Sequence, residues 1–87
     1  MDERRLDGNA IGGDLMELFG TEMTVAWAVC RSCGAHEQLA EMRVYRDAPG
    51  IVGRCVHCEA VLLRIVHAPG RSYVEFSGVA SLEMRVS

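Results

Sequence analysis

The sequence contains no lysine, two prolines, few aromatic residues and no long hydrophobic run. All nine basic residues are arginine, which indicates GC-rich codon usage before any selection for function. No apolar run approaches the roughly 20 residues that span a bilayer, so no membrane segment is expected. The charged start, residues 1–10, is not followed by the apolar segment of a secretory signal. These absences favour a cytoplasmic protein, in which thiols stay reduced and disulfides are rare.

The composition indicates one folded domain. A chain of 87 residues can bury only a modest core, and small domains often need an additional staple. The hydrophobic fraction of 49% excludes a disordered chain. The net charge of −3 weighs against binding of nucleic acid, which requires phosphates to be neutralised. Residues 30–71 nevertheless carry six arginines against four acidic residues, an excess that four thiolates on one Zn²⁺ would cancel.

Residues 8–19 are expected to form an N-terminal helix. Apolar side chains recur there at helical spacing and form one stripe. The stripe consists of Ile11, Leu15, Leu18 and Phe19. Asp7 or Asn9 suits the start of the helix, and Gly20 suits a left-handed end. Gly12 and Gly13 weaken this prediction, because each glycine costs a helix roughly 1 kcal/mol relative to alanine.

From residue 24 to residue 87 the apolar period is two, which predicts about five short antiparallel strands. The apolar faces of these strands are expected to be Val25, Trp27 and Val29; Ala40, Met42 and Val44; Val61, Leu63 and Ile65; Val74 and Phe76; and Leu82, Met84 and Val86. Two similar turns, DAPG at 47–50 and HAPG at 67–70, place proline and glycine as a type II turn requires. The strands are therefore expected to form hairpins.

The four cysteines form two C-x-x-C pairs, Cys30 with Cys33 and Cys55 with Cys58. Two cysteines three apart in a tight turn direct both sulfurs towards one point. The 21 residues between the pairs lie just beyond the usual spacing of structural zinc sites. They contain the turn at 47–50, which folds the second pair back towards the first. The pattern predicts one Zn²⁺ per chain in a closed tetrahedral site with four thiolate ligands.

Iron is the main alternative metal, because rubredoxin-like proteins use two similar turns and four thiolates suit either metal. Those proteins usually pack the metal with more aromatic residues than this chain contains, which favours zinc. A dithiol redox pair would require a thioredoxin-like βαβ context, which is missing. His36 and His57 are expected outside the ligand shell, because four cysteines complete it. Glu59 follows the second pair where Gly34 follows the first, which predicts a different turn exit or some strain.

Four segments of the sequence are informative together: LDGNAIGGDLMELFGTEMT, CRSCG, VYRDAPGIVGRCVHCEAVLLRIV and GVASLEMRVS. They resemble a family of small bacterial zinc-ribbon proteins known only as a domain of unknown function. The resemblance covers nearly the whole chain, including a helical N-terminus that generic zinc ribbons lack. It implies Cys30, Cys33, Cys55 and Cys58 as metal ligands, and it implies no activity. We expect a small mainly-β zinc ribbon in a single domain over 1–87, with a helix over 8–19 and ribbon and sheet over 24–87.

No catalytic constellation is visible: the sequence has no G-x-S-x-G, no phosphate-binding glycine loop and no H-E-x-x-H. We therefore expect no enzyme and no small-molecule substrate. The expected function is a protein-interaction or accessory module with a protein partner or a second copy of the chain. Phe19, Trp27 and the Leu62–Val66 face offer more apolar surface than one sheet and one short helix cover.

Two alternative functions stay open at this stage. One is an electron carrier in which iron replaces zinc. The other is a zinc ribbon that binds nucleic acid, with local positive charge outweighing the net charge. The arginines that this alternative would use are Arg31, Arg43, Arg46, Arg54, Arg64 and Arg71.

Overall fold

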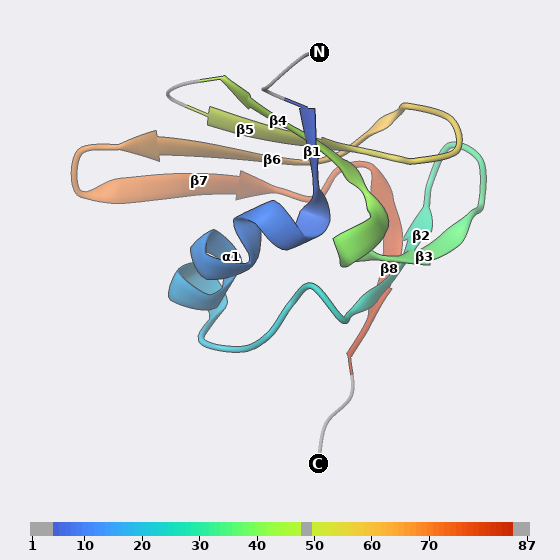
Figure 1. Cartoon of the computed structure of the whole chain (residues 1–87), viewed down its shortest axis with the longest axis horizontal. Coiled ribbons are helices and arrows are strands. Elements are labelled where there is room, and N and C mark those ends of the chain that lie inside the picture. The colour runs from blue at the N-terminus through green and yellow to red at the C-terminus, as the bar shows by residue number, and fades with distance from the viewer. Residues whose placement is uncertain (1–4, 48–49, 85–87) are drawn as a thin grey trace.

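The computed structural model describes residues 5–47 and 50–84, and its strands form two antiparallel sheets (Figure 1). The five-stranded sheet has the order β1 (Arg5–Asp7), β4 (Arg43–Asp47), β5 (Gly50–Arg54), β6 (Val61–Ala68) and β7 (Arg71–Glu75). The three-stranded sheet has the order β3 (His36–Gln38), β2 (Trp27–Cys30) and β8 (Val79–Glu83). The mainly-β class with an N-terminal helix is confirmed, although the described strands outnumber the five expected.

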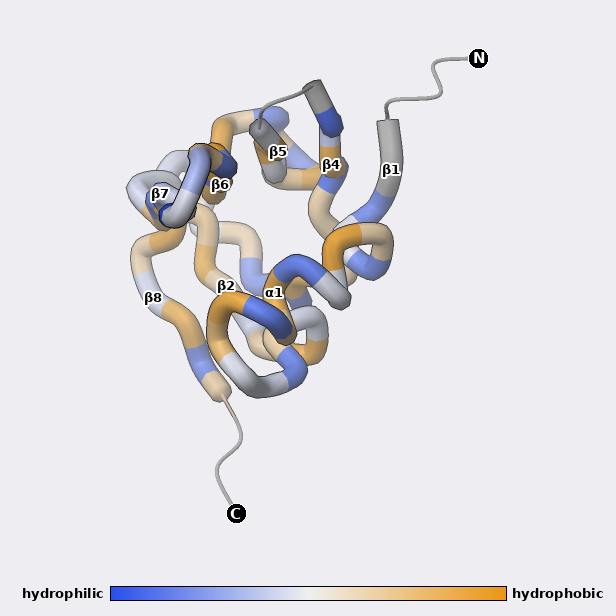
Figure 2. Tube along the Cα trace, turned by 90° about the vertical axis from the view of Figure 1, so that its left-hand side faces the viewer, coloured by the Kyte–Doolittle hydropathy of each residue, from blue (hydrophilic) through white to orange (hydrophobic). Residues whose placement is uncertain are grey.

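The helical span begins and ends where the sequence suggests, but it has two parts. A 3₁₀ turn, η1 (Gly8–Ile11), leads directly into α1 (Gly12–Phe19). The Asp7 carboxylate accepts a hydrogen bond from the Asn9 N–H at the start, and Gly20 ends the helix with φ of 71°. Figure 2 shows hydrophilic and hydrophobic segments alternating along α1, as in an amphipathic helix. Within the described residues, no helix is both long and apolar enough to cross a membrane.

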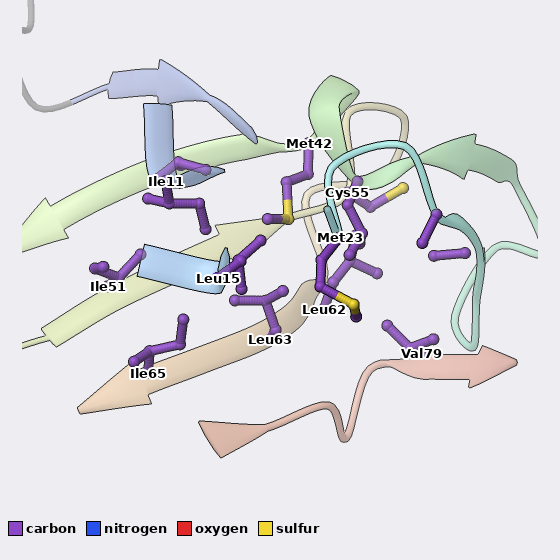
Figure 3. Close-up of a cluster of buried hydrophobic side chains, with 14 of the residues drawn as sticks. Ile11, Leu15, Met23, Met42, Ile51, Cys55, Leu62, Leu63, Ile65 and Val79 are labelled. Carbon is purple, nitrogen blue, oxygen red and sulfur yellow. The ribbon is translucent and has the colours of Figure 1, made fainter. Parts of the chain in front are cut away.

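The apolar face of α1 packs on the inner face of the five-stranded sheet (Figure 3). Ile11 and Leu15 are completely buried there, as are Leu63 and Ile65 of β6. Burying one such side chain stabilises the fold by about 1.5–3 kcal/mol relative to leaving it exposed. The alternation predicted for β6 is confirmed, because Arg64 points to solvent between these two buried residues.

The second predicted strand begins later than expected. Ala40 lies in a short 3₁₀ helix, η2 (Leu39–Glu41), and β4 starts only at Arg43. Met42 and Val44 are buried as predicted. The short helix places Leu39 in the hydrophobic core, where it is 1% exposed.

The prediction for β2 is wrong about which side faces the core. Val25 and Trp27 are 56% and 40% exposed, so the large apolar side chains point outward. The buried face consists of Ala26, Ala28 and Cys30. Alternation alone does not say which of two faces is buried. Here Cys30 fixes the choice, because its side chain faces the second cysteine pair.

The expected surplus of apolar surface is only partly present. Leu62, Leu63 and Ile65 are buried inside the chain itself, so the prediction that the Leu62–Val66 face seeks a partner is wrong. Phe19 and Trp27 do remain exposed, at 41% and 40%. At the C-terminal end Met84 is also exposed, whereas Val86 lies outside the described residues.

Both predicted hairpins are present. Ala68 pairs with Arg71 across the β6–β7 turn, and Gly70 supplies the positive φ, 75°, that a type II turn requires. Asp47 pairs with Gly50 across the β4–β5 turn, whose proline lies outside the described residues. The β4–β5 hairpin returns the chain between the two cysteine pairs, as the sequence predicts.

Candidate metal centre

The two cysteine pairs lie in hairpin loops of different sheets. The first cysteine turn, Cys30–Cys33, follows β2 and leads to β3 in the three-stranded sheet. The second cysteine turn, Cys55–Cys58, connects β5 to β6 in the five-stranded sheet. Figure 1 shows the two loops side by side at one edge of the molecule. A group that binds both turns therefore joins the two sheets.

The four sulfur atoms lie close enough to surround one metal ion. Cys30 Sγ is 3.7 Å from Cys58 Sγ, and Cys33 Sγ is 3.7 Å from Cys55 Sγ. All four sulfurs lie within 4.8 Å of one another. A tetrahedron with metal–sulfur bonds of about 2.3 Å has sulfur–sulfur edges of about 3.8 Å. The donor set therefore fits a tetrahedral ion, and the 3.7 Å distances are far longer than a disulfide bond.

The position of the ligands is asymmetric with respect to solvent. The first cysteine of each pair, Cys30 or Cys55, is buried, and the second, Cys33 or Cys58, is exposed. The metal would sit at the edge of the core, with one side against the apolar interior and one side near the surface. Four protein ligands complete a tetrahedral shell, so no position is left for water or a substrate.

The backbones of the two cysteine turns are equivalent. In the first turn the Gly34 N–H donates to the Cys30 carbonyl, and the Cys30 N–H donates to the Ala35 carbonyl. In the second turn Glu59 and Ala60 occupy the places of Gly34 and Ala35, with the same bonds to Cys55. Glu59 has φ of 68° and Gly34 has φ of 79°. The second turn therefore has the same exit as the first, and Glu59 bears the backbone strain.

Backbone N–H groups stabilise the sulfur charge. Burial raises the pKa of the Cys30 thiol, but the N–H groups of Cys33 and Ser32 and the hydrogen bonds from the Cys58 and Cys33 thiols together outweigh it, and the pKa falls from 9.0 to about 7. At Cys33 the N–H of Ala35 lowers the pKa, but partial desolvation and the thiols of Cys58, Cys55 and Cys30 raise it to about 12. In the second turn the His57 N–H lies 3.4 Å from Cys55 Sγ. Such donors favour the thiolate, the form that binds metal.

Two arginines support the exit of the second turn. Arg43 of β4 forms an ion pair with the Glu59 carboxylate, and Arg54 of β5 donates to the Glu59 carbonyl oxygen at 2.9 Å. These contacts hold Glu59 in its left-handed conformation from both its side chain and its backbone. The sequence signals only the unusual residue type at position 59, and it does not indicate the supporting pair.

The histidines near the cysteines lie outside the cluster. His57 Nε2 is 2.8 Å from the Glu37 carboxylate, an exposed contact that connects the second cysteine turn to β3. The His36 ring contacts the Trp27 ring in a tilted arrangement with centroids 4.8 Å apart, and its Nε2 is 3.7 Å from the Glu83 carboxylate. Glu37 was not singled out in the sequence, because nothing local marks a surface glutamate as a contact between two loops.

Arg31 anchors the first cysteine turn to the chain that enters β8. Its Nε and Nη2 donate to the carbonyl oxygens of Ser77 and Val79, at 3.1 and 3.2 Å. The Arg31 N–H donates to the Gly78 carbonyl oxygen as well. A Cβ atom at Gly78 would overlap the Val61 carbonyl, so only glycine allows this close approach. Arg31 therefore has a positioning role here.

No curated protein and no solved structure matches the chain. One protein-family profile does match it, over residues 1–87, and its description gives no function. The match covers the helix, both sheets and all four cysteines. The chain therefore belongs to the "Family of unknown function (DUF6510)".

Proposed function

We propose that this chain is a small cytoplasmic zinc ribbon that binds one structural Zn²⁺ through Cys30, Cys33, Cys55 and Cys58. The observation that carries the proposal is the sulfur geometry, with two 3.7 Å contacts that each join the two cysteine turns. A reducing compartment keeps the thiolates available for metal. Because four thiolates close the shell, the metal stabilises the fold and performs no catalysis.

The second part of the proposal is that the metal-stabilised scaffold is a protein-interaction or accessory module. The outer face of the three-stranded sheet supports it. Val25, Trp27 and Met84 are exposed there and line a cavity of about 620 Å³ together with Gln38 and Glu83. We call these five residues the Trp27 surface. An apolar surface with a polar rim is typical of a contact with another protein or a second copy of the chain.

Elemental analysis of protein purified from cells supplied with both zinc and iron tests the first part. We expect about one zinc and no iron per chain. Stoichiometric iron with a red colour would instead support the rubredoxin-like electron carrier. The absence of any bound metal would overturn the site itself.

Affinity capture from the native host, combined with sedimentation of the purified protein, tests the second part. We expect a specific protein partner or a dimer that is lost on Trp27→Ser. The matched control is Tyr73→Ser, because Tyr73 is also a solvent-exposed aromatic residue, at 56% against 40% for Trp27, but lies on β7 of the other sheet. Equal retention of the partner by both variants would show that the Trp27 surface is not the interface.

A further inference from the structure

The register of the five-stranded sheet places most of its arginines on one face. Arg43 of β4 lies directly opposite Arg54 of β5, and Arg64 of β6 lies opposite Val52, two residues before Arg54 on the same strand. Side chains two residues apart in a strand point to the same side of a sheet. This side is opposite to the one that packs on α1, where Val44 and Ile51 are buried.

Two tyrosines lie among these arginines. Tyr45 pairs with Val52 in the register, and Tyr73 pairs with Val66, so both share the outer face with Arg64. Arg71 is the first residue of β7 and lies two residues before Tyr73, on the same face. Its guanidinium is 6.0 Å from the centre of the Tyr73 ring. Tyr73 is 56% exposed, which leaves much of its ring accessible. We call Arg43, Arg54, Arg64, Arg71, Tyr45 and Tyr73 the arginine face.

The positive charge of the arginine face is only partly neutralised. Arg43 pairs with Glu59, and Arg64 lies 3.9 Å from Glu75. Among the described residues, no carboxylate lies within ion-pair distance of Arg54 or Arg71. Like charges directly opposite each other in a sheet are destabilising. Glu59 already offsets the charge of the Arg43–Arg54 pair, with its carboxylate at Arg43 and its carbonyl oxygen at Arg54, so a phosphate has to compete with Glu59 there.

The net acidity of the chain does not cancel this local field. The strands of the three-stranded sheet carry Glu37 and Glu83 and no arginine, so the two sheets differ in charge. Charges separated by more than about 8–10 Å are largely screened at physiological salt. Surface ion pairs such as Arg64–Glu75 are worth only about 0–1 kcal/mol, so a phosphate can displace the carboxylate.

We propose that the arginine face binds single-stranded nucleic acid. Phosphate oxygens accept hydrogen bonds from the guanidinium groups, and an unpaired base stacks on the exposed Tyr73 ring. A single strand is the occupant of choice because a duplex keeps its bases stacked inside and offers no ring to Tyr73. This inference goes beyond the proposed structural role of zinc. It concerns the five-stranded sheet, whereas the Trp27 surface lies on the three-stranded sheet.

Fluorescence anisotropy with the zinc-loaded full chain and a labelled mixed-sequence 12-nucleotide single strand tests the proposal. We expect micromolar affinity near physiological salt. The affinity should fall with salt on a log–log slope of about −2.8, since each of four phosphate contacts contributes about −0.7. The double variant Arg64→Gln/Arg71→Gln should reduce this slope to about −1.4. Tyr73→Ala should weaken binding roughly tenfold, whereas Tyr73→Phe should retain it.

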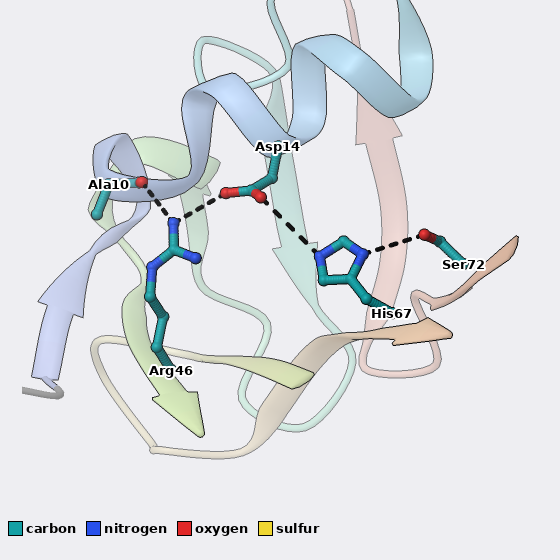
Figure 4. A network of polar contacts seen from close by, with 5 residues as sticks. All are labelled: Ala10, Asp14, Arg46, His67 and Ser72. Carbon is teal, nitrogen blue, oxygen red and sulfur yellow. Dashed lines mark hydrogen bonds and ion pairs between the residues drawn. The ribbon is translucent and has the colours of Figure 1, made fainter. Parts of the chain in front are cut away.

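Arg46→Gln is the matched control for charge. Arg46 lies on β4 between Tyr45 and Asp47, but its guanidinium reaches the opposite side, where it binds the Asp14 carboxylate at 2.8 Å and the Ala10 carbonyl at 3.0 Å (Figure 4). Its loss should leave the slope and the affinity unchanged. A melting curve of each variant confirms that it is folded.

Three results would overturn the proposal. One is the absence of single-strand binding by the wild-type protein at about 100 μM, a concentration about 100-fold above the expected dissociation constant. Another is an equal loss of affinity in Arg46→Gln and in the arginine-face variants. The third is a duplex of the same length that binds as tightly as the single strand, because stacking on Tyr73 would then contribute nothing.

Discussion

Glu59 and Gly34 occupy equivalent positions in the two cysteine turns, with φ angles of 68° and 79°. A side chain in this left-handed region costs roughly 1–2 kcal/mol, and glycine avoids the cost. Arg43 and Arg54 compensate by holding Glu59 in place. The second turn thus needs the side chains of Glu59, Arg43 and Arg54 to adopt the conformation that the first turn adopts with a single glycine, Gly34.

Substitutions at these two positions should have opposite effects. Glu59→Gly should be more stable than Glu59→Ala by about 1 kcal/mol, because both lose the Arg43 contact and only the glycine relieves the strain. Gly34→Ala should destabilise the protein by a similar amount. Denaturant unfolding of the zinc-loaded proteins measures these differences. Equal stabilities of the two variants at position 59 would contradict the strain.

Removal of the metal should unfold the chain. Binding of a structural zinc ion can contribute about 10 kcal/mol, which is comparable to the whole stability of a small domain. A strong chelator, or Cys55→Ser, should therefore abolish the cooperative melting transition in circular dichroism. His57→Ala is the control within the same turn, because His57 contacts Glu37 and lies outside the sulfur cluster. A Cys55→Ser protein with a native melting temperature would show that the metal does not hold the fold.

Acid should release the metal and unfold the protein together. Protons compete with metal for thiolates, so affinity is higher at high pH and falls as pH falls. Because the pKa of Cys33 is about 12, the metal must displace a proton from this thiol at every physiological pH. Cys30, whose lowered pKa is about 7, joins it only below pH 7. The apparent affinity should therefore fall by at least about one decade per pH unit above pH 7 and by at least about two decades per pH unit below it.

Competition with a chromophoric chelator between pH 6 and pH 8 measures this dependence. Circular dichroism at each pH shows whether metal loss and unfolding coincide. An affinity that stays constant across this range would mean that fewer thiolates bind the metal than the cluster suggests.

Two glycines provide a contrast in local packing. Gly78→Ala should prevent stable folding, because a Cβ there overlaps the Val61 carbonyl at the entry to β8. Gly13→Ala should stabilise the protein by about 0.5–1 kcal/mol, since Gly13 lies in α1 with open space around it and alanine favours the helix. Expression level and thermal melting of the two variants distinguish these effects. A Gly78→Ala protein as stable as the wild type would contradict the close approach.

The sequence predicted the helix, the hairpins and the four sulfurs because each depends on a local pattern. The orientation of β2 was mispredicted because hydrophobicity favoured Val25 and Trp27 over Ala26 and Ala28. The parity of Cys30 was the available signal, since a ligand that faces the second cysteine turn places Ala26 and Ala28 on its own side. The size of an apolar side chain therefore does not predict which face of a strand is buried when a metal ligand on that strand fixes the buried face.

The arginine positions could not be derived from the sequence for a different reason. Whether Arg43, Arg54 and Arg64 share a face depends on how neighbouring strands pair, and a shift of one residue would invert each strand. A register shift between Gly53 and Arg54 in the pairing with β6 shows how little the spacing alone determines. The role of Arg31 was equally hidden, because its partners lie more than 40 residues away along the chain, at Ser77 and Val79.

The location of the two cysteine turns in separate hairpins also determines how the chain can assemble. Within one turn the ligands are neighbours, so a single hairpin can capture a metal ion through two thiolates before the rest of the chain folds. The contact between Cys30 and Cys58 spans 28 residues and forms only when the second hairpin arrives. Closing such a loop costs entropy, and non-local contacts slow folding. An ion held by one cysteine turn can then bind the cysteines of the other turn. Refolding should therefore accelerate with metal concentration, until most chains hold the ion on one turn before the second turn docks.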